Sequence, residues 1–335
     1  MSSAPTPEEI AGDARWLAQA LEPAEGLVRV IAMDREAYRA ASFLDDRMLQ
    51  SPVDARVVPW RAVQEATAAE LRQDARWIFH IGHVGSTLVS RLLGEIEGVL
   101  AVREPRLLRD LALAEADVRA PYSASVPKLM SRTFASNEVA CVKATSFVSE
   151  IAPRLVPPRE RALFMFASPR NYIASILAGE NSVKELHALA SSRAERMANR
   201  VGAPPANNEA ELAAIAWACE MTALEASADA MPDRSIAWAD FDAMLDAMPA
   251  ELARVADALG IVADADRLHA VAEGPLMQRY SKALEYDYTP QLRRELIAGV
   301  TGRHGEAIDC ALAMLHSATE KSPLLARAMR RAGEI

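Results

Sequence analysis

Short apolar runs alternate with segments of helical periodicity along much of the chain. The clearest runs are WIFHI (77–81), VLAVR (99–103), VACVKA (139–144), ALFMFA (162–167) and SIAWA (235–239). Near-continuous apolar strands that alternate with helices are typical of a parallel sheet covered on both faces. We therefore predict an α/β fold of three α/β/α layers around a central parallel sheet.

Further elements are predicted on either side of these runs. The segment TPEE at 6–9 combines an N-cap residue, a proline at the first helical position and acids in the first turn, so we expect a helix over 7–22. Short β-rich runs follow at 27–33 and 55–60, with a helical segment between them, and the chain is helical from about 182 to 230, with a break at 202–209, and again from 289. We expect an N-terminal extension or cap (1–72), a main domain (73–290) with a helical insertion at about 182–230, and a C-terminal helical segment (291–335).

Composition narrows the class of protein. With 335 residues, 51% of them hydrophobic, the chain can bury a full core, and a formal net charge of −9 gives no general attraction to nucleic acid. Cys141, Cys219 and Cys310 are odd in number and lie in apolar surroundings, without metal-ligand spacing. The sequence shows neither a basic and apolar leader nor an apolar run of about 20 residues. We expect a cytoplasmic protein without a membrane span, whose oligomeric state the sequence does not reveal.

The stretch WIFHIGHVGSTLVSRLL at 77–93 looks like a strand that leads into a phosphate-binding loop. When the kinase-type loop G-x-x-x-x-G-K-[ST] is aligned on Gly85, His80 stands where its first glycine belongs and Ser86 where its lysine belongs. A strand, a glycine-bearing turn and a helix N-terminus nevertheless present free N–H groups to an anion, and Ser86 and Thr87 add hydroxyls. The alternative is a tight connection without a ligand.

The loop HVGSTLVSRLL, with the later segment VREPR, resembles the phosphosulfate-binding loop and catalytic glutamate of the sulfotransferases that use 3′-phosphoadenylyl sulfate (PAPS), in particular the tyrosylprotein branch and its bacterial relatives. The resemblance implies a P-loop-type fold and carries over these residues: Gly85, Ser86, Thr87 and Leu88 in the loop, Glu104 as the catalytic glutamate and Arg106 as a neighbouring site arginine.

The resemblance continues in the family's order over roughly 77–290. CVKATSFVSEI resembles the segment "lKsP-x-HL", FASPRNYIAS resembles "RDPRDxxxS", and SIAWADF with LARVADALGI is similar to "YEDL…fLGi". QRYSKALEYDY resembles a late basic segment that closes over the cofactor. These segments imply site roles for Lys143, for Ser175 at the 3′-phosphate, and for Arg279, Ser281 and Lys282.

Two positions depart from the family pattern. His83 stands where the loop usually carries lysine or arginine, and a histidine with a pKa near ~6.5 is only partly cationic at neutral pH. Ala167 replaces the arginine that begins "RDPRD", so a main contact to the 3′-phosphate is lost. Arg170, three residues later, is the expected substitute.

The resemblance implies transfer of a sulfuryl group from PAPS to a hydroxyl or amine of a small-molecule or peptide acceptor. Glu104 would be the general base, and His83 and Lys143 would hold the transferring group and the leaving phosphate. No metal is required, because a sulfuryl group carries less charge than a phosphoryl group. Two alternatives stay open: a kinase-like phosphotransferase or nucleotide hydrolase with a degenerate loop, and a non-catalytic binding protein.

Each candidate also has a purely structural interpretation. Glu104 could cap the helix that starts at Pro105, and Lys143 could be a surface lysine. Ser175 could bond to a preceding carbonyl inside its helix, and His80 is more typical of a core or supporting histidine than of a catalyst. A solvated helix face is favoured over an acceptor site for Lys184, His187, Arg193, Arg196 and Arg200.

Overall fold

The centre of the protein is a parallel sheet of five strands. The structure is a computed structural model that describes residues 5–202, 205–283, 285 and 287–335. The sheet has the order β5-β6-β4-β7-β8, and every neighbouring pair is parallel. Its strands are β4 (Arg76–His80), β5 (Val99–Arg103), β6 (Val139–Lys143), β7 (Arg161–Phe166) and β8 (Ser235–Asp240). All five apolar runs are therefore confirmed as strands of one sheet.

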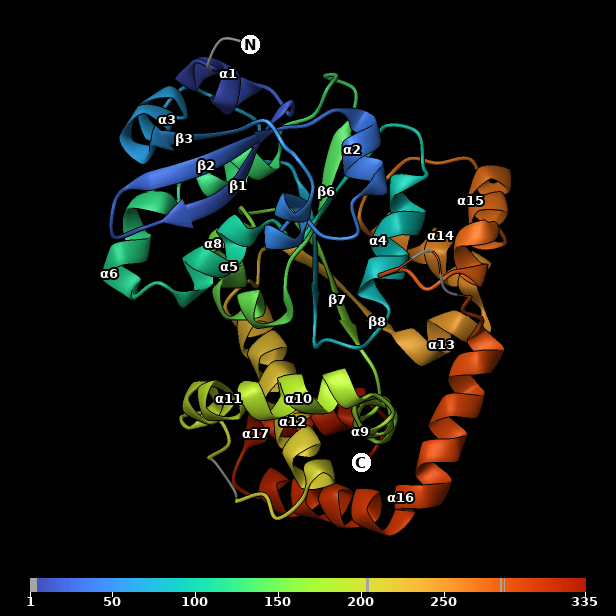
Figure 1. The fold of residues 1–335 in the computed structure, drawn as a ribbon. Helices are drawn as coiled ribbons and strands as arrows, with labels where there is room; N and C mark the ends of the chain where they lie inside the picture. Colours follow the sequence, from blue (N-terminus) through green and yellow to red (C-terminus); the bar gives the residue numbers. More distant parts are fainter. Residues whose placement is uncertain (1–4, 203–204, 284, 286) are drawn as a thin grey trace.

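Helices cover this sheet on both faces, which confirms the predicted α/β class (Figure 1). On one face, α4 (Ser86–Gly94) contacts β5 and β6, and α14 (Met248–Ala258) contacts β7, β8 and α4. On the other, α12 (Glu209–Asp229) contacts β4 and α9 (Pro169–Leu177). Central strand side chains such as Trp77 are completely buried. The strands consequently read as continuous apolar runs rather than as alternating ones.

The N-terminal part forms a second, antiparallel sheet, and here the predicted helix over 7–22 is wrong. The helix α1 (Pro7–Gly12) ends early, and residues 16–22 form β1 (Trp16–Glu22). β1 pairs with β2 (Leu27–Ala32), which pairs with β3 (Ala55–Pro59). Residues 17–21 are buried, and the N–H of Leu21 donates to Asp110 at 2.9 Å. Tertiary pairing therefore overrides the helix propensity of this alanine- and leucine-rich stretch.

The chain between 182 and 230 and from 289 onward is helical, as predicted. It forms α10 (Glu180–Ala188), α11 (Ala190–Met197) and α12, and later α16 (Pro290–Thr319), which bends at His304, and α17 (Pro323–Arg331). In Figure 1 these helices gather at the end of the molecule away from the N-terminal sheet. The expected break at 202–209 falls before α12, and its residues 203–204 lie outside the described residues, as do 284 and 286 of the late basic segment.

The remaining elements are short connections. They comprise the helices α2 (Arg35–Ala40), α3 (Trp60–Ala66), α5 (Arg106–Leu113), α6 (Ala116–Arg119), α7 (Val126–Met130), α8 (Ala152–Leu155), α13 (Phe241–Asp246) and α15 (Ala265–Ala272), and the 3-10 turns η1 (Asp46–Gln50), η2 (Ala120–Tyr122), η3 (Ser146–Ile151) and η4 (Pro275–Gln278). None of the described helices combines the length and the apolar character that crossing a bilayer requires.

Candidate functional site

The loop between β4 and α4 has a backbone that depends on glycine. Gly82 and Gly85 have φ values of 83° and 59°, and Gly85 is the N-cap residue of α4. A Cβ at Gly85 would lie 2.0 Å from the ring of Phe241, so no other residue fits there. The Thr87 hydroxyl is buried and has no hydrogen-bond partner among the described residues. The start of α4 therefore offers N–H groups and a hydroxyl to an anion.

Glu104 and Lys143 meet at the carboxyl ends of β5 and β6. The parallel register of these strands places Arg103 opposite Lys143, so the residue after β5 lies beside the end of β6. The Lys143 ammonium contacts the Glu104 carboxylate, and the Thr145 hydroxyl donates to Glu104 Oε2 at 3.3 Å. Burial lowers the pKa of Lys143, and the Glu104 charge opposes that shift. A buried lysine and a half-buried carboxylate thus form an ion pair next to the loop.

The structure excludes the purely structural interpretations of Glu104 as a helix cap and of Lys143 as a surface lysine. The helix α5 begins after Pro105 without any side-chain cap, so Glu104 does not act as its cap. The Lys143 side chain is 1% exposed, so it is not a surface lysine.

Backbone strain coincides with the candidate site. Among the described residues, His83, Glu104 and Arg159 are the non-glycine residues with positive φ, at 54°, 51° and 66°. Such a conformation is costly for a side-chain-bearing residue and persists only where the surroundings enforce it. Two of these three residues are site residues predicted from the sequence.

The electrostatic surroundings keep His83 neutral. Burial, together with the charges of Lys282, Arg193 and Arg293, lowers its pKa to about 3. His83 is therefore uncharged at neutral pH in the unliganded protein, rather than partly cationic as its ordinary pKa predicts. The three cations that act on it also show that positive charge gathers around the loop. The sequence favoured a solvated helix face for Arg193 and did not mark Arg293 at all.

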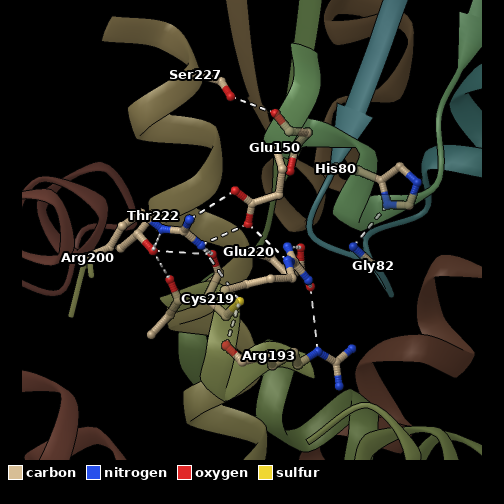
Figure 2. A network of polar contacts seen from close by, with 12 residues as sticks. His80, Gly82, Glu150, Arg193, Arg200, Cys219, Glu220, Thr222 and Ser227 are labelled. Carbon is tan, nitrogen blue, oxygen red and sulfur yellow. Dashed lines mark hydrogen bonds and ion pairs between the residues drawn. The ribbon is translucent and has the colours of Figure 1, made fainter. Parts of the chain in front are cut away.

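Arg193 is buried and held by an ion-pair network. Its side chain is 8% exposed, and its Nε lies 3.5 Å from a Glu220 carboxylate oxygen. Both Nη atoms of Arg196 donate to the same carboxylate at 2.8 Å. Arg196 and Arg200 also donate hydrogen bonds to the Glu150 carboxylate (Figure 2). The prediction of a solvated helix face is therefore wrong for these three arginines. Lys184 and His187 are exposed.

The Arg193 guanidinium keeps spare hydrogen-bonding capacity. Neither its Nε nor its Nη1 has a hydrogen-bond partner among the described residues, and the buried hydroxyl of Tyr172 has none either. Tyr172 is an edge-on neighbour of His83, with ring centroids 6.3 Å apart. Arg193 thus brings a buried, incompletely bonded cation to the side of the loop.

Arg293 brings a second such cation from the start of α16. Its Nε donates to Asp242 at 2.9 Å, while its Nη2 is buried without a partner among the described residues. The guanidinium lies 5.0 Å from the centre of the Phe241 ring, the same ring that packs on Gly85. No local sequence motif marks Arg193 or Arg293, because both reach the loop through the packing of distant helices.

The other predicted residues lie in varied settings. Arg170 pairs with Asp309 at 2.6 Å and is 40% exposed, and Arg106 pairs with Asp46 and Asp110. The Ser175 hydroxyl donates to the Tyr172 carbonyl at 2.8 Å, the contact of a helix-interior serine. Leu88 is buried in the core, so only its backbone can reach a ligand.

The late basic segment lies over α4. The Ser281 carbonyl accepts a hydrogen bond from Arg91 of α4 at 2.9 Å, and Arg279 pairs with Asp287. The Lys282 charge lowers the pKa of His80, His83 and Lys143, which places this lysine near all three. In the part of the chain that the structure describes, no three His, Cys, Asp or Glu side chains are grouped to hold a metal ion.

Comparisons with known proteins return likenesses of structure only. No family model and no curated protein matches the sequence. A solved sulfotransferase domain from the curacin biosynthetic pathway matches with a TM-score of 0.43 and 12% identity, over 67% of this chain and 87% of that chain. Retinol dehydratase, solved in complex with androsterone and the inactive cofactor PAP, matches with a TM-score of 0.34 and 11% identity, over 77% and 89% of the two chains. At these values, the roles of individual residues rest on the geometry of this chain.

Proposed function

We propose that this protein transfers a sulfuryl group from PAPS to a hydroxyl or amine acceptor, with Glu104 as the general base. The observation that carries the proposal is the meeting of three parts at one edge of the sheet. These parts are an anion-binding loop, a buried lysine and a carboxylate on a strained backbone, from the ends of β4, β6 and β5. The loop has no lysine of its own, and Lys143 supplies that charge from the neighbouring strand.

The residues divide the chemistry between them. When bound, PAPS supplies an activated sulfur, which the acceptor oxygen or nitrogen attacks as the bond from sulfur to the 5′-phosphate oxygen breaks. Glu104 takes the proton that the acceptor loses, and the leaving bisphosphate keeps the electron pair of the broken bond. Lys143 and the N–H groups at the start of α4 stabilise the negative charge that develops on the leaving oxygen.

The buried donors without partners around the loop fit a nucleotide that carries a 3′-phosphate as its second phosphate. Thr87 Oγ1, Arg193 Nη1 and Arg293 Nη2 are buried donors without a hydrogen-bond partner among the described residues. A buried donor without an acceptor is costly, so an anion that accepts from these groups gains that free energy on binding. We assign the second phosphate of PAPS to Arg193 and Arg293, in place of the arginine that Ala167 replaces.

Thermal stabilisation by ligands tests the cofactor class first. A ligand that binds only the native state raises its stability by mass action. We expect adenosine 3′,5′-bisphosphate (PAP) to raise the melting temperature at concentrations at which AMP, and ATP with magnesium, do not. Stabilisation by magnesium ATP alone would favour a kinase-like phosphotransferase, and no response to any of the three ligands would reject PAPS as the cofactor.

A further inference from the structure

His80, the last residue of β4, uses both of its ring nitrogens. The N–H of Gly82 donates to His80 Nδ1 at 2.9 Å (Figure 2), and His80 Nε2 lies 2.9 Å from the Ala144 carbonyl. A backbone N–H can only donate and a carbonyl can only accept, so Nδ1 must be bare and Nε2 must carry the proton. These two contacts therefore fix both the tautomer and the neutral state of the ring.

The surroundings of His80 favour this neutral form. The residue is 6% exposed, and burial holds the pKa of the ring well below its ordinary value. The charges of Lys143 and Lys282 lower the pKa further, while Glu104 Oε1 lies 3.9 Å from Nε2. A protonated ring could not accept the hydrogen bond from Gly82, so the hydrogen bonds and the electrostatics both favour the neutral ring.

The two bonds join three parts of the candidate site. Gly82 is the first glycine of the loop, and its φ of 83° belongs to a backbone region that costs glycine little to leave. Ala144 directly follows Lys143, and its own N–H donates to the Ile78 carbonyl at 3.0 Å. His80 therefore ties the first glycine of the loop to the strand end that carries the buried lysine.

We propose that His80 is a positioning residue, whose neutral imidazole pins the Gly82 amide and so fixes the loop that binds the anion. Without an acceptor at Nδ1, the glycine-containing loop regains conformational freedom and must lose it again when a ligand binds. The bond from Nε2 has a separate task, because it satisfies the buried Ala144 carbonyl and contributes to stability.

Two substitutions separate these tasks. In His80→Asn the side-chain oxygen takes roughly the place of Nδ1 and can accept from Gly82, but nothing reaches Ala144. In His80→Gln the terminal amide takes roughly the place of Nε2 and can donate to Ala144, but nothing accepts from Gly82. The variants are matched in chemistry and differ in which of the two bonds they keep.

Amide hydrogen exchange of the unliganded protein is the direct measurement. We expect His80→Gln to reduce the protection of the Gly82 amide at least about tenfold, and His80→Asn to leave it within about threefold of the natural protein. His80→Asn should instead lower the melting temperature more. Equal loss of protection in both variants, or unchanged protection in His80→Gln, would overturn the proposal.

A measurement on the unaltered protein guards against a variant that does not fold. The ¹⁵N chemical shifts of the His80 ring report its tautomer directly. We expect a bare Nδ1 and a protonated Nε2 at pH 7, and a charged ring or a protonated Nδ1 would overturn the proposal as firmly as the exchange data.

Affinity for PAP supplies the functional readout, and this arm alone rests on the proposed function. We expect His80→Gln to weaken PAP binding about tenfold and His80→Asn to leave it within about threefold, in the opposite order to their effects on the melting temperature. If the natural protein does not bind PAP, the proposed function fails while the exchange measurement still decides the role of His80.

Discussion

At the scale of single residues, Glu104 is placed by three constraints. Its backbone has a φ of 51°, its carboxylate contacts the buried Lys143, and Thr145 donates to its second oxygen at 3.3 Å. A carboxylate held by one cation and one hydroxyl keeps a defined direction, which a general base needs in order to reach the proton of an acceptor. The side chain contacts the end of β6 and does not cap α5.

Glu104→Gln should remove the base and leave the cofactor site intact. The amide is nearly the size of the carboxylate, and its oxygen can still accept from Lys143 while its NH2 group donates to the Thr145 hydroxyl oxygen, but it cannot take up the proton. We expect the release of PAP from PAPS, with an acceptor or with water, to fall about 10²–10⁴-fold. The affinity for PAP, measured by calorimetry, should change less than about threefold.

The control for this variant is Glu97→Gln, which removes the same charge from an exposed position after α4. It should leave both turnover and PAP affinity unchanged. Turnover of Glu104→Gln at the level of this control would exclude Glu104 from the mechanism.

The residues that sequence reasoning could find are those marked by local context. Glu104 and Lys143 directly follow or end apolar strands, and the loop carries its glycines between a strand and a helix. Arg193 and Arg293 have no such mark, because they act at the loop only through the packing of α11 and α16. Helical spacing alone could not separate the buried Arg193 from the exposed Lys184 on the preceding helix.

At the scale of elements, the five central strands and the start of the N-terminal helix were predictable, whereas the early end of that helix and the strand β1 after it were not. An apolar run such as 162–167 has no polar face, so a buried strand accounts for it without further information. Residues 16–22 carry good helix formers and become a strand only because β2 lies alongside and Asp110 accepts from Leu21. The strand conformation of β1 therefore depends on the residues that it contacts rather than on its own sequence.

The placement of helices also decides which arginine can serve the second phosphate. Arg170 on α9 is engaged by Asp309 of α16, whereas Arg193 on α11 is held toward the loop by Glu220 of α12. We expect Arg193→Met to weaken PAP binding by at least about tenfold while weakening AMP binding much less, since a charge-assisted contact to the second phosphate is lost. Glu220 keeps its two bonds from Arg196, so the variant should fold.

Arg170→Met is the matched control, because it removes the same charge from the neighbouring helix. It should change PAP affinity by less than about threefold. Calorimetric titration with PAP and with AMP checks both variants. A larger, PAP-selective loss in Arg170→Met than in Arg193→Met would return the second phosphate to Arg170.

At the scale of the whole molecule, the charge is unevenly distributed. The chain carries a formal net charge of −9, yet Lys282, Arg193 and Arg293 all act on His83. An acidic protein with a local group of cations repels extended polyanions and can still bind a small one. The net charge of −9 gives no general attraction to nucleic acid, and only the fold reveals where cations lie close together.

This local charge makes global stability depend on pH through His83. The folded-state pKa is about 3, below the unfolded value near 6.5, so between these values the unfolded chain binds a proton that the native state does not. The contribution of His83 is fully present above pH 6.5 and is lost as the pH falls toward 3. Each pH unit of acidification within this window lowers the free energy of unfolding by up to about 1.4 kcal/mol. The pKa of His80 is also lowered, so His80 changes the stability in the same direction.

Urea unfolding at pH 7, 6, 5 and 4.5 measures this dependence. The comparison is with His83→Asn, because asparagine tolerates the positive φ of 54° and does not titrate. We expect the natural protein to lose about 2 kcal/mol more than the variant between pH 7 and 4.5, once partial exposure of the ring is allowed for. Carboxylates that titrate in this range affect both proteins alike and cancel in the difference. Parallel stability curves for the two proteins would mean that His83 has the same pKa in the native and unfolded states, and that burial and the cations around the loop do not act on it as the structure indicates.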